Sequence, residues 1–314
     1  MRFIAKRLCV TLITLVLVSL FTFAAFTLIP GDPAALILGT EGTEEQLAAL
    51  RLEMGLDRSF AERYFSWLRG FLTGKLGNSV RFRGEAIAAM ILERLPVTAA
   101  LASLALVFIF LIAFPLSLAG IRRGGSLSDR AVHTLTALNI SFPAFFLGIL
   151  FIWIFGVILR FFIPGAYVDY REDPGAFFLY LVFPALAIAI PNAAILVKFL
   201  RTSIEKELRS LYARTAYSKG ASPNGVLFRH VFKNAVIPSV TLLGMIVGEV
   251  FSGSIIIEQV FTIPGIGRLL IASINSRDYQ LIATLVVYIS FIVVLANTLA
   301  DIAIQIIDPR IRVH

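Results

Sequence analysis

Six long apolar runs divide the sequence and constrain its fold more than any other feature. They extend roughly over residues 8–29, 97–121, 132–159, 177–197, 236–257 and 281–307. A helix that crosses the hydrocarbon core of a bilayer needs about 20 apolar residues. The runs are apolar on all sides rather than alternating, which favours membrane-spanning helices over strands of a barrel. We therefore expect an all-α integral membrane protein with six transmembrane helices.

Composition agrees with a membrane protein and gives no sign of catalysis. The chain is 58% hydrophobic and only 15% charged, far outside the usage of soluble domains. Cys9 is the single cysteine, so the chain cannot form an internal disulfide or a cysteine metal site. The stretch "GKLGNS" lacks the spacing and the Ser or Thr of a phosphate-binding loop. We expect no catalytic residue, metal site or cofactor on this chain, and the net charge of +8 requires no nucleic acid.

The distribution of basic residues predicts how the chain is oriented. With a cytoplasmic N-terminus, sixteen of the 28 Lys and Arg lie on the cytoplasmic side, eight of them between the fourth and fifth runs. Most of the others lie in one long segment that has nearly as many acids, and long segments weigh little in the positive-inside rule. We expect both termini in the cytoplasm. The first run is expected to be an uncleaved helix, because it is longer than the apolar part of a signal peptide.

The polar segment over residues 30–96 is expected to form a small folded insert outside the cytoplasm. Its opposite charges nearly cancel, which favours a folded unit over a disordered linker. The pattern "TEEQLAALRLEMGL" predicts a helix with Thr43 as its N-cap and Glu45 near the capping-box position. Residues 1–29 then contain the cytoplasmic N-terminus and the first span, and residues 97–314 form a five-helix core.

Several residues inside the runs indicate close packing or a polar pathway. Glycine or serine recurs every fourth residue in the fifth run, a spacing that lets helices pack closely; these residues are Gly244, Gly248 and Ser252. Glu249 lies mid-span, where an ionised side chain costs about 2.5–3.5 kcal/mol. It predicts a water-filled pathway, and a protonated glutamate that only fixes packing is the alternative. Pro143 and Asn139 are further pathway candidates, although a proline kink also fits ordinary packing.

The most polar stretch between two runs is "RTAYSKGASPNGVLFRH", residues 214–230. A helix is predicted from Leu200 to Lys219 with Glu205 and Arg209 as an i,i+4 pair, and with one face made of Leu200, Ile204, Leu208, Leu211 and Thr215. Gly220 ends that helix, and Ser222 followed by Pro223 begins a second one. The two helices form a compact cytoplasmic knob, residues 201–235. Its exposed Tyr and Arg favour a docking surface for another protein, and a simple basic loop is the alternative.

The same stretch resembles the cytoplasmic signature of ABC importer permeases, with small residues before a glycine and an Ile-Pro after a spacer. Further motifs follow in the order found in the dipeptide/oligopeptide/nickel permease family. They are "LIPGDPAALILG", "MGLDRSFAERYFSWL", "GKLGNSV", "LERLPVTAALA", "VFTIPGIGRLL", "RDYQ" and "DPRIR". The resemblance covers essentially the whole chain. It implies the type I ABC importer permease fold in the inner membrane of a bacterial cell.

The resemblance also implies partners and roles for particular residues. Two separate ATPase subunits would bind ATP and Mg, which accounts for the lack of a phosphate-binding loop here. The docking surface for them would consist of Tyr212, Arg214, Thr215, Ala216, Lys219 and Gly220, braced by Arg229 and His230. A second, homologous permease would complete the pathway, and an extracytoplasmic solute-binding protein would deliver the cargo. Changing Gly220 to Asp is expected to uncouple transport without preventing membrane insertion.

The cargo stays open at this point. Di- and oligopeptides are the first expectation, and a nickel or other metal complex handled by the same family is the alternative, favoured slightly by Glu249 in "GEVFSGS". The knob lacks the acidic residue that usually stands at its start in the family. The alternative from another class of protein is a self-contained secondary transporter. Such a transporter would need coupling residues inside the membrane, and Glu249 is the only clear intramembrane acid in the sequence.

Overall fold

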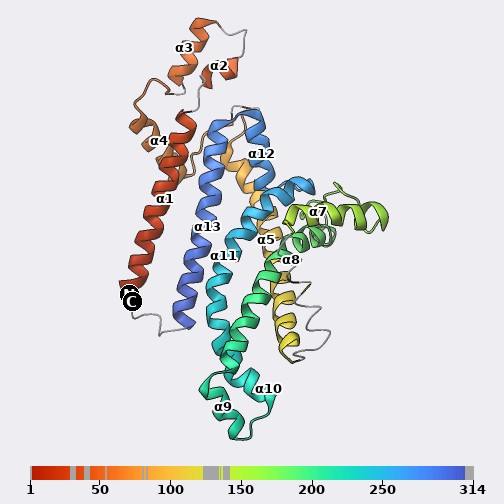
Figure 1. The fold of residues 1–314 in the computed structure, drawn as a ribbon. Helices are drawn as coiled ribbons and strands as arrows, with labels where there is room; N and C mark the ends of the chain where they lie inside the picture. The colour runs from red at the N-terminus through yellow and green to blue at the C-terminus, as the bar shows by residue number, and fades with distance from the viewer. Residues whose placement is uncertain are drawn as a thin grey trace.

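Five helices long and apolar enough to cross a membrane dominate the computed structural model. It describes residues 2–28, 33–38, 43–53, 55–79, 81–82, 84–122, 134, 136 and 142–307. The long helices are α1 (Arg2–Leu28), α5 (Ile87–Arg122), α8 (Pro174–Leu208), α11 (Phe232–Val260) and α13 (Tyr279–Ile307). Figure 1 shows them extending along a common direction, as helices that cross one bilayer must. The expected all-α membrane fold is confirmed.

The third predicted span is described only in its second half. There α7 (Ala144–Phe151) continues into the π-helical segment η2 (Ile152–Ile158), and together they form a shorter apolar helix. Most of residues 132–141, including Asn139, lie outside the described residues. Pro143 has φ −62° and ψ 146° and is the N-cap of α7. It therefore begins a helix instead of kinking one, whereas Pro115, Pro184 and Pro191 lie inside helices.

The main core lies where α5, α8 and α11 pack together. Large buried side chains alternate there with alanines that let the helix backbones approach each other. The buried set includes Leu101, Ala105, Ile109, Leu181, Ala185, Ile188, Ala189, Leu196, Ile246 and Val250. Because lipid tails are as apolar as leucine, such close packing rather than exclusion from water stabilises helix association in a bilayer.

Helix α1 packs against α13 and leaves much of its surface uncovered. Thr11 and Thr298 share a hydrogen bond of 2.7 Å, and Arg7 forms an ion pair with Asp301. Many other α1 side chains are apolar and exposed, among them Leu12, Ile13 and Phe21. This helix therefore presents an apolar face to the surrounding membrane.

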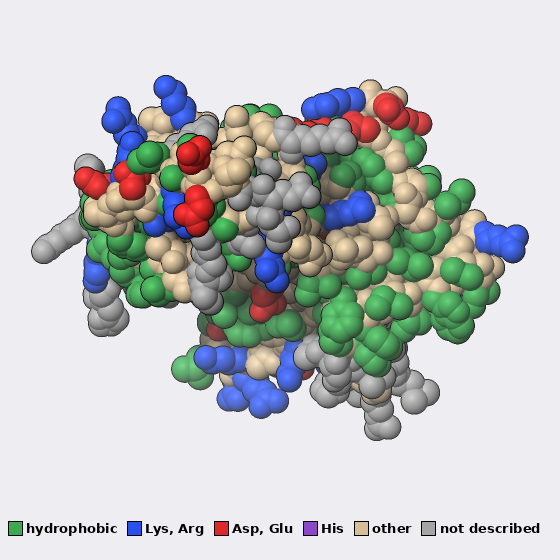
Figure 2. All heavy atoms as spheres, turned by 90° about the horizontal axis from the view of Figure 1, so that it is seen from above, with side chains coloured by type: hydrophobic (Ala, Val, Ile, Leu, Met, Phe, Trp, Pro, Cys, Tyr) green, Lys and Arg blue, Asp and Glu red, His purple; other side chains and the backbone are tan. Residues whose placement is uncertain are grey.

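Shorter helices gather at the end of the molecule opposite the knob (Figure 1). They are α2 (Pro33–Leu38), α3 (Glu44–Glu53), α4 (Phe60–Thr73) and α12 (Ile266–Ser276). Figure 2, which looks onto this end, shows acidic and basic side chains interspersed. In α3 the capping partner of Thr43 is Gln46 and not Glu45, because Gln46 is the third helical residue and its side chain reaches back to the Thr43 N–H.

The expected boundary between insert and core, at residues 96 and 97, falls inside a helix. Helix α5 begins at Ile87 and includes Pro96, so the end of the insert and the second span are one element. The preceding loop is held against the start of α13. Ser79 donates a hydrogen bond to the buried Asp278, and the Gln280 side chain donates to the Leu76 carbonyl at 3.0 Å. The motifs "GKLGNSV" and "RDYQ" are thus in contact.

Candidate coupling knob and pathway face

The knob begins with a break that the sequence analysis did not predict. Helix α8 ends at Leu208, and Ser210 caps the next helix, α9 (Leu211–Ser218). The Ser210 hydroxyl donates to the Glu207 carbonyl and accepts from the Ala213 N–H, so it satisfies groups at both helix ends. The single helix predicted over residues 200–219 is therefore wrong. Leu211 is exposed as a result and does not continue the buried face of α8.

Gly220 makes the turn between α9 and the next helix, α10 (Pro223–Val226). Its φ of +84° lies in the left-handed region that glycine adopts without strain. The N–H of Ala221 donates to the Ala216 carbonyl at 3.1 Å, which closes the helix end. Ser222 then caps α10 by accepting from the Gly225 N–H at 3.2 Å, with Pro223 as the first helical residue. The helix stop and the second start lie at the predicted residues.

A small apolar core gives the knob a fixed shape. After α10 the π-helical segment η3 (Leu227–Val231) leads directly into α11. The core joins α8, α9, α10, η3 and the start of α11 through buried residues Leu200, Ile204, Ala213, Val226, Leu227, Val231 and Ala235. An exposed loop that only satisfied the positive-inside rule would need no such core. The knob therefore has the rigidity that a docking surface requires.

The predicted docking residues lie mostly on the outside of this core. Tyr212, Arg214, Thr215, Lys219 and Gly220 are exposed, and Ala216 is half-buried against the core. The bracing role expected of Arg229 and His230 stays a prediction. Both side chains are exposed on η3, because the packing contacts of this segment are made by its apolar residues.

Tyr212 brings an acidic side chain of the knob next to the docking residues. Its hydroxyl donates to the carboxylate of Glu207, which lies in the last turn of α8. Partial burial raises the pKa of Tyr212, and the nearby carboxylate adds to that effect. The phenol therefore stays protonated as a donor at neutral pH. The knob motif does not predict the pairing of Tyr212 with Glu207, because Glu207 lies before the break between α8 and α9.

The candidate pathway residues divide between two faces of α11. Gly248 faces α13, where a Cβ would lie 3.3 Å from Val293 Cγ1, and Gly244 is buried. Gly248 therefore lies in a close contact between α11 and α13, and the packing role of Gly244 stays a prediction. Glu249 and Ser252 are exposed instead, on the side that also carries Met245. Ser252 thus lies on the exposed side of α11 and not on the side that contacts α13.

Glu249 has no hydrogen-bond or ion-pair partner among the described residues. A protonated glutamate that fixes packing inside this chain would need such a partner, so the packing alternative loses its support. A carboxylate exposed on a spanning helix must instead meet water or another protein. Pro143 is also exposed, at the start of α7. Among the described residues, no hydrogen bond or ion pair joins Pro143 and Glu249 into one site.

Sequence analysis missed a buried carboxylate at the far end of α11. Glu258 is fully buried and accepts hydrogen bonds from Thr98 of α5 at 2.6 Å and from the N–H groups of Gly267 and Arg268 at 2.7 and 3.1 Å. It therefore caps the N-terminus of α12, which has no side-chain cap of its own. The available signal was a glutamate shortly before the glycines of "IPGIG". Glu258 directly follows the predicted fifth run, residues 236–257.

Comparison with known proteins places these features in one family. Residues 111–313 match the family described as binding-protein-dependent transport system inner membrane component, and residues 1–102 match the N-terminal domain of such components. The chain belongs to this permease family. It is accordingly a multi-pass inner membrane protein and a transport subunit, of the kind that works with binding-protein and ATPase partners.

Several proteins with similar sequences are named as permeases of peptide or glutathione transport systems. A Sinorhizobium fredii protein named as a probable peptide ABC transporter permease is 35% identical over 310 residues, which cover 99% of each chain. A Brucella abortus protein named as a peptide transport system permease is 34% identical over 98% of each chain. The glutathione transport system permease of Salmonella choleraesuis is 33% identical over 99% of each chain.

Among the described residues, no group of His, Cys, Asp and Glu could hold a metal ion.

Proposed function

We propose that the chain is one of two permease subunits in an ATP-driven importer of di- and oligopeptides. The observation that carries this proposal is the knob, a rigid helical projection with exposed Tyr212 and Arg214 around the Gly220 turn. A projection of this kind suits a groove on a separate ATPase subunit, which would move it on binding and hydrolysing ATP. ATP and Mg would be bound by two such ATPase subunits and not by this chain.

The exposed side of α11 supports a pathway shared with a second, homologous permease. Glu249, Ser252 and Met245 lie on that side without a partner in the described part of the chain. A second permease facing them would enclose an aqueous route in which the Glu249 carboxylate stays hydrated. Both termini would be cytoplasmic with the knob, and an extracytoplasmic binding protein would dock at the end formed by α2, α3, α4 and α12.

The names of the relatives favour cargo with a peptide backbone, since two are named for peptides and one for glutathione. The Glu249 carboxylate, which has no partner among the described residues, suits the ammonium group at the N-terminus of such cargo. The nickel-complex alternative rests on the same carboxylate, and no group of protein ligands supports it among the described residues.

Affinity purification from gently solubilised native membranes tests the proposal. The tagged chain should retain two ATPase subunits and a second permease, identified by mass spectrometry. A variant in which Gly220 is changed to Val should insert normally and lose the ATPase subunits. The ligand extracted from a co-purifying binding protein should be a peptide.

Recovery of the chain alone or only with itself, under several mild detergents, would contradict the importer proposal. The secondary-transporter alternative would then apply, with Glu249 as its coupling residue. A metal complex recovered from the binding protein would leave the importer assignment standing and replace the peptide cargo.

A further inference from the structure

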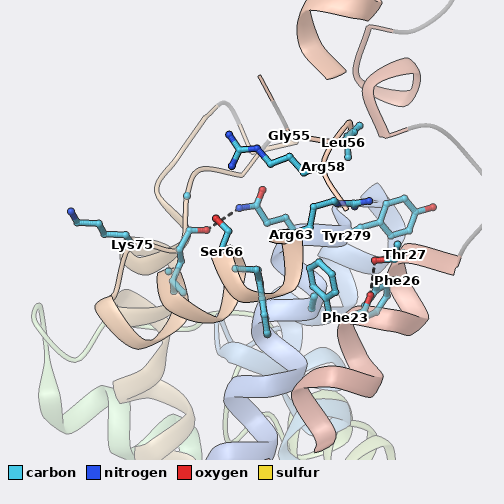
Figure 3. A pocket seen from close by; sticks show the side chains of 16 residues that line it. Phe23, Phe26, Thr27, Gly55, Leu56, Arg58, Arg63, Ser66, Lys75 and Tyr279 are labelled. Atoms are coloured by element: carbon cyan, nitrogen blue, oxygen red, sulfur yellow. Dashed lines mark hydrogen bonds between the residues drawn. The ribbon is translucent and has the colours of Figure 1, made fainter. Parts of the chain in front are cut away.

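A cavity of about 340 Å³ lies between α1, α4 and α13, at the end of the molecule opposite the knob. Aromatic side chains from three elements line it, namely Phe23 and Phe26 of α1, Trp67 of α4 and Tyr279 of α13. Figure 3 shows Arg63 extending from α4 toward Tyr279, with Arg58 nearby. Three parts of the chain that are distant in sequence thus form one site.

The charged side chains that line this cavity, among the described residues, are all basic, namely Arg58, Arg63 and Lys75. Glu62 outside the lining is close enough to Arg58 for the two charges to interact, and its own hydrogen bonds go to Ser59. Arg63 has its guanidinium 6.0 Å from the centre of the Phe23 ring. Arginine beside an aromatic face is well suited to hold a phosphate or carboxylate in a partly desolvated site. The cavity therefore fits an anionic group.

The wall of the cavity is built so that it keeps its shape. Gly74 ends α4 in the left-handed conformation, and the following loop returns so closely that a Cβ on Gly70 would lie 2.6 Å from the Lys75 carbonyl oxygen. The Gln280 side chain holds the same loop by donating to the Leu76 carbonyl. A pre-formed wall lowers the entropy cost of binding a ligand.

The position of the cavity indicates the surface of the bilayer. Phe23, Phe26 and Thr27 belong to the last turns of a spanning helix, and tyrosine and tryptophan are enriched at the membrane interface. Helix α4 beside them exposes Phe60, Phe65 and Leu72, as a helix lying in the headgroup region does. Phospholipid phosphates lie at this level. The apolar exposed face of α1 continues from the cavity into the membrane.

We propose that this cavity binds the phosphate of an anionic phospholipid, with the acyl chains lying along α1. Arg58 and Arg63 hold the phosphate oxygens, Lys75 adds positive charge at the edge, and the aromatic side chains contact the glycerol region. The lipid would join α4 to α1 and α13, and so fix the extracytoplasmic insert relative to the spans. This inference does not depend on the cargo or on the ATPase partners.

Native mass spectrometry of the complex extracted from membranes tests the lipid site. Wild-type complex is exchanged into detergent with equal phosphatidylglycerol and phosphatidylcholine, and the lipids retained are counted. The Arg58→Gln/Arg63→Gln double variant should retain at least about tenfold less phosphatidylglycerol than wild type, because it removes two charge-assisted contacts. The control pair Arg69→Gln/Arg277→Gln removes two exposed charges at the same end, outside the cavity, and should retain it like wild type.

The conservative pair Arg58→Lys/Arg63→Lys separates charge from folding, and it should restore most of the retention. Equal retention by wild type, the glutamine pair and the control pair would overturn the proposal, as would equal retention of both lipids. If millimolar inorganic phosphate binds at Arg63 in wild type while no lipid is retained, the site takes free phosphate and the lipid assignment is wrong.

Discussion

The carboxylate of Glu258 accepts a hydrogen bond of 2.6 Å from the hydroxyl of Thr98, a residue 160 positions earlier in the chain. The Thr98 hydroxyl in turn accepts from the N–H of Ile266 at 2.9 Å. Two side chains thus satisfy the first N–H groups of α12, which would otherwise be buried without partners. This arrangement joins α5, α11 and α12 at one end of the molecule.

Replacing Glu258 with Ala should strongly destabilise the protein. Two backbone N–H groups and the Thr98 hydroxyl would lose a buried acceptor, at about 1–3 kcal/mol for each unsatisfied group. The unfolding temperature of the solubilised complex should fall clearly. Glu249→Ala is the matched control on the same helix, because Glu249 is exposed and has no partner in the described part of the chain. It should leave the unfolding temperature nearly unchanged. Equal shifts for both variants would show that Glu258 has no capping role.

The glycines beside this carboxylate should tolerate no side chain. A Cβ on Gly267 would lie 2.3 Å from Ile255 Cα, a backbone atom that cannot move aside easily. Gly267→Ala should therefore cost at least about 1–3 kcal/mol through overpacking. Gly253→Ala is the control, because its Cβ would only touch Ile188 Cγ2 at 4.0 Å. Size-exclusion profiles of fluorescently tagged variants measure the folded fraction, and similar profiles would argue against the close contact.

Local signals and apolar runs predicted much of the fold. Five of the six predicted runs correspond to long helices, namely α1, α5, α8, α11 and α13, because a bilayer demands side chains that are apolar on all sides. Gly220 and the Ser222-Pro223 pair marked the turn of the knob through backbone rules that act within a few residues. These parts of the structure depend little on distant contacts.

Pairings between distant residues could not be predicted in the same way. Glu258 is a charged residue just after an apolar run, where the sequence favours a solvent-exposed position. Its burial depends on contacts with distant residues such as Thr98 of α5. The break at Ser210 depends on whether its hydroxyl caps a new helix or the existing helix continues, a choice that tertiary packing decides. Asp278 and Ser79 likewise meet only because the loop before α5 lies against the start of α13.

Substitutions at Gly220 should separate backbone strain from charge. No atom of a described residue lies within 4 Å of a Cβ at this position, so the left-handed φ and the added group decide the effect. Gly220→Asn should be tolerated best, since asparagine adopts this conformation, whereas Gly220→Val should cost at least about 1–2 kcal/mol locally. Uptake assays combined with ATPase co-purification measure the effect. The Val variant should lose both, with normal membrane insertion.

Gly220→Asp adds an acid to the basic knob without much more backbone strain than Asn. We expect it to lose transport as well, because the charge would face the partner surface. Asp and Asn variants that both transport normally would contradict the assignment of this turn to ATPase docking. Equal loss in both would assign the defect to the backbone and not to charge.

Glu249→Gln should weaken transport of peptides that carry a free N-terminal ammonium group. The change keeps the shape of an exposed side chain and removes its charge, so the fold should be unaffected. A charge-assisted hydrogen bond contributes about 1.5–3 kcal/mol, which corresponds to roughly tenfold or more in uptake at limiting cargo. Uptake of the same peptide with an acetylated N-terminus is the comparison and should change little. Ser252→Ala, one turn away on the same face, controls for general disturbance of the pathway wall. If Glu249→Gln slows both peptides equally, the carboxylate serves contact with the second permease and not recognition of the ammonium group.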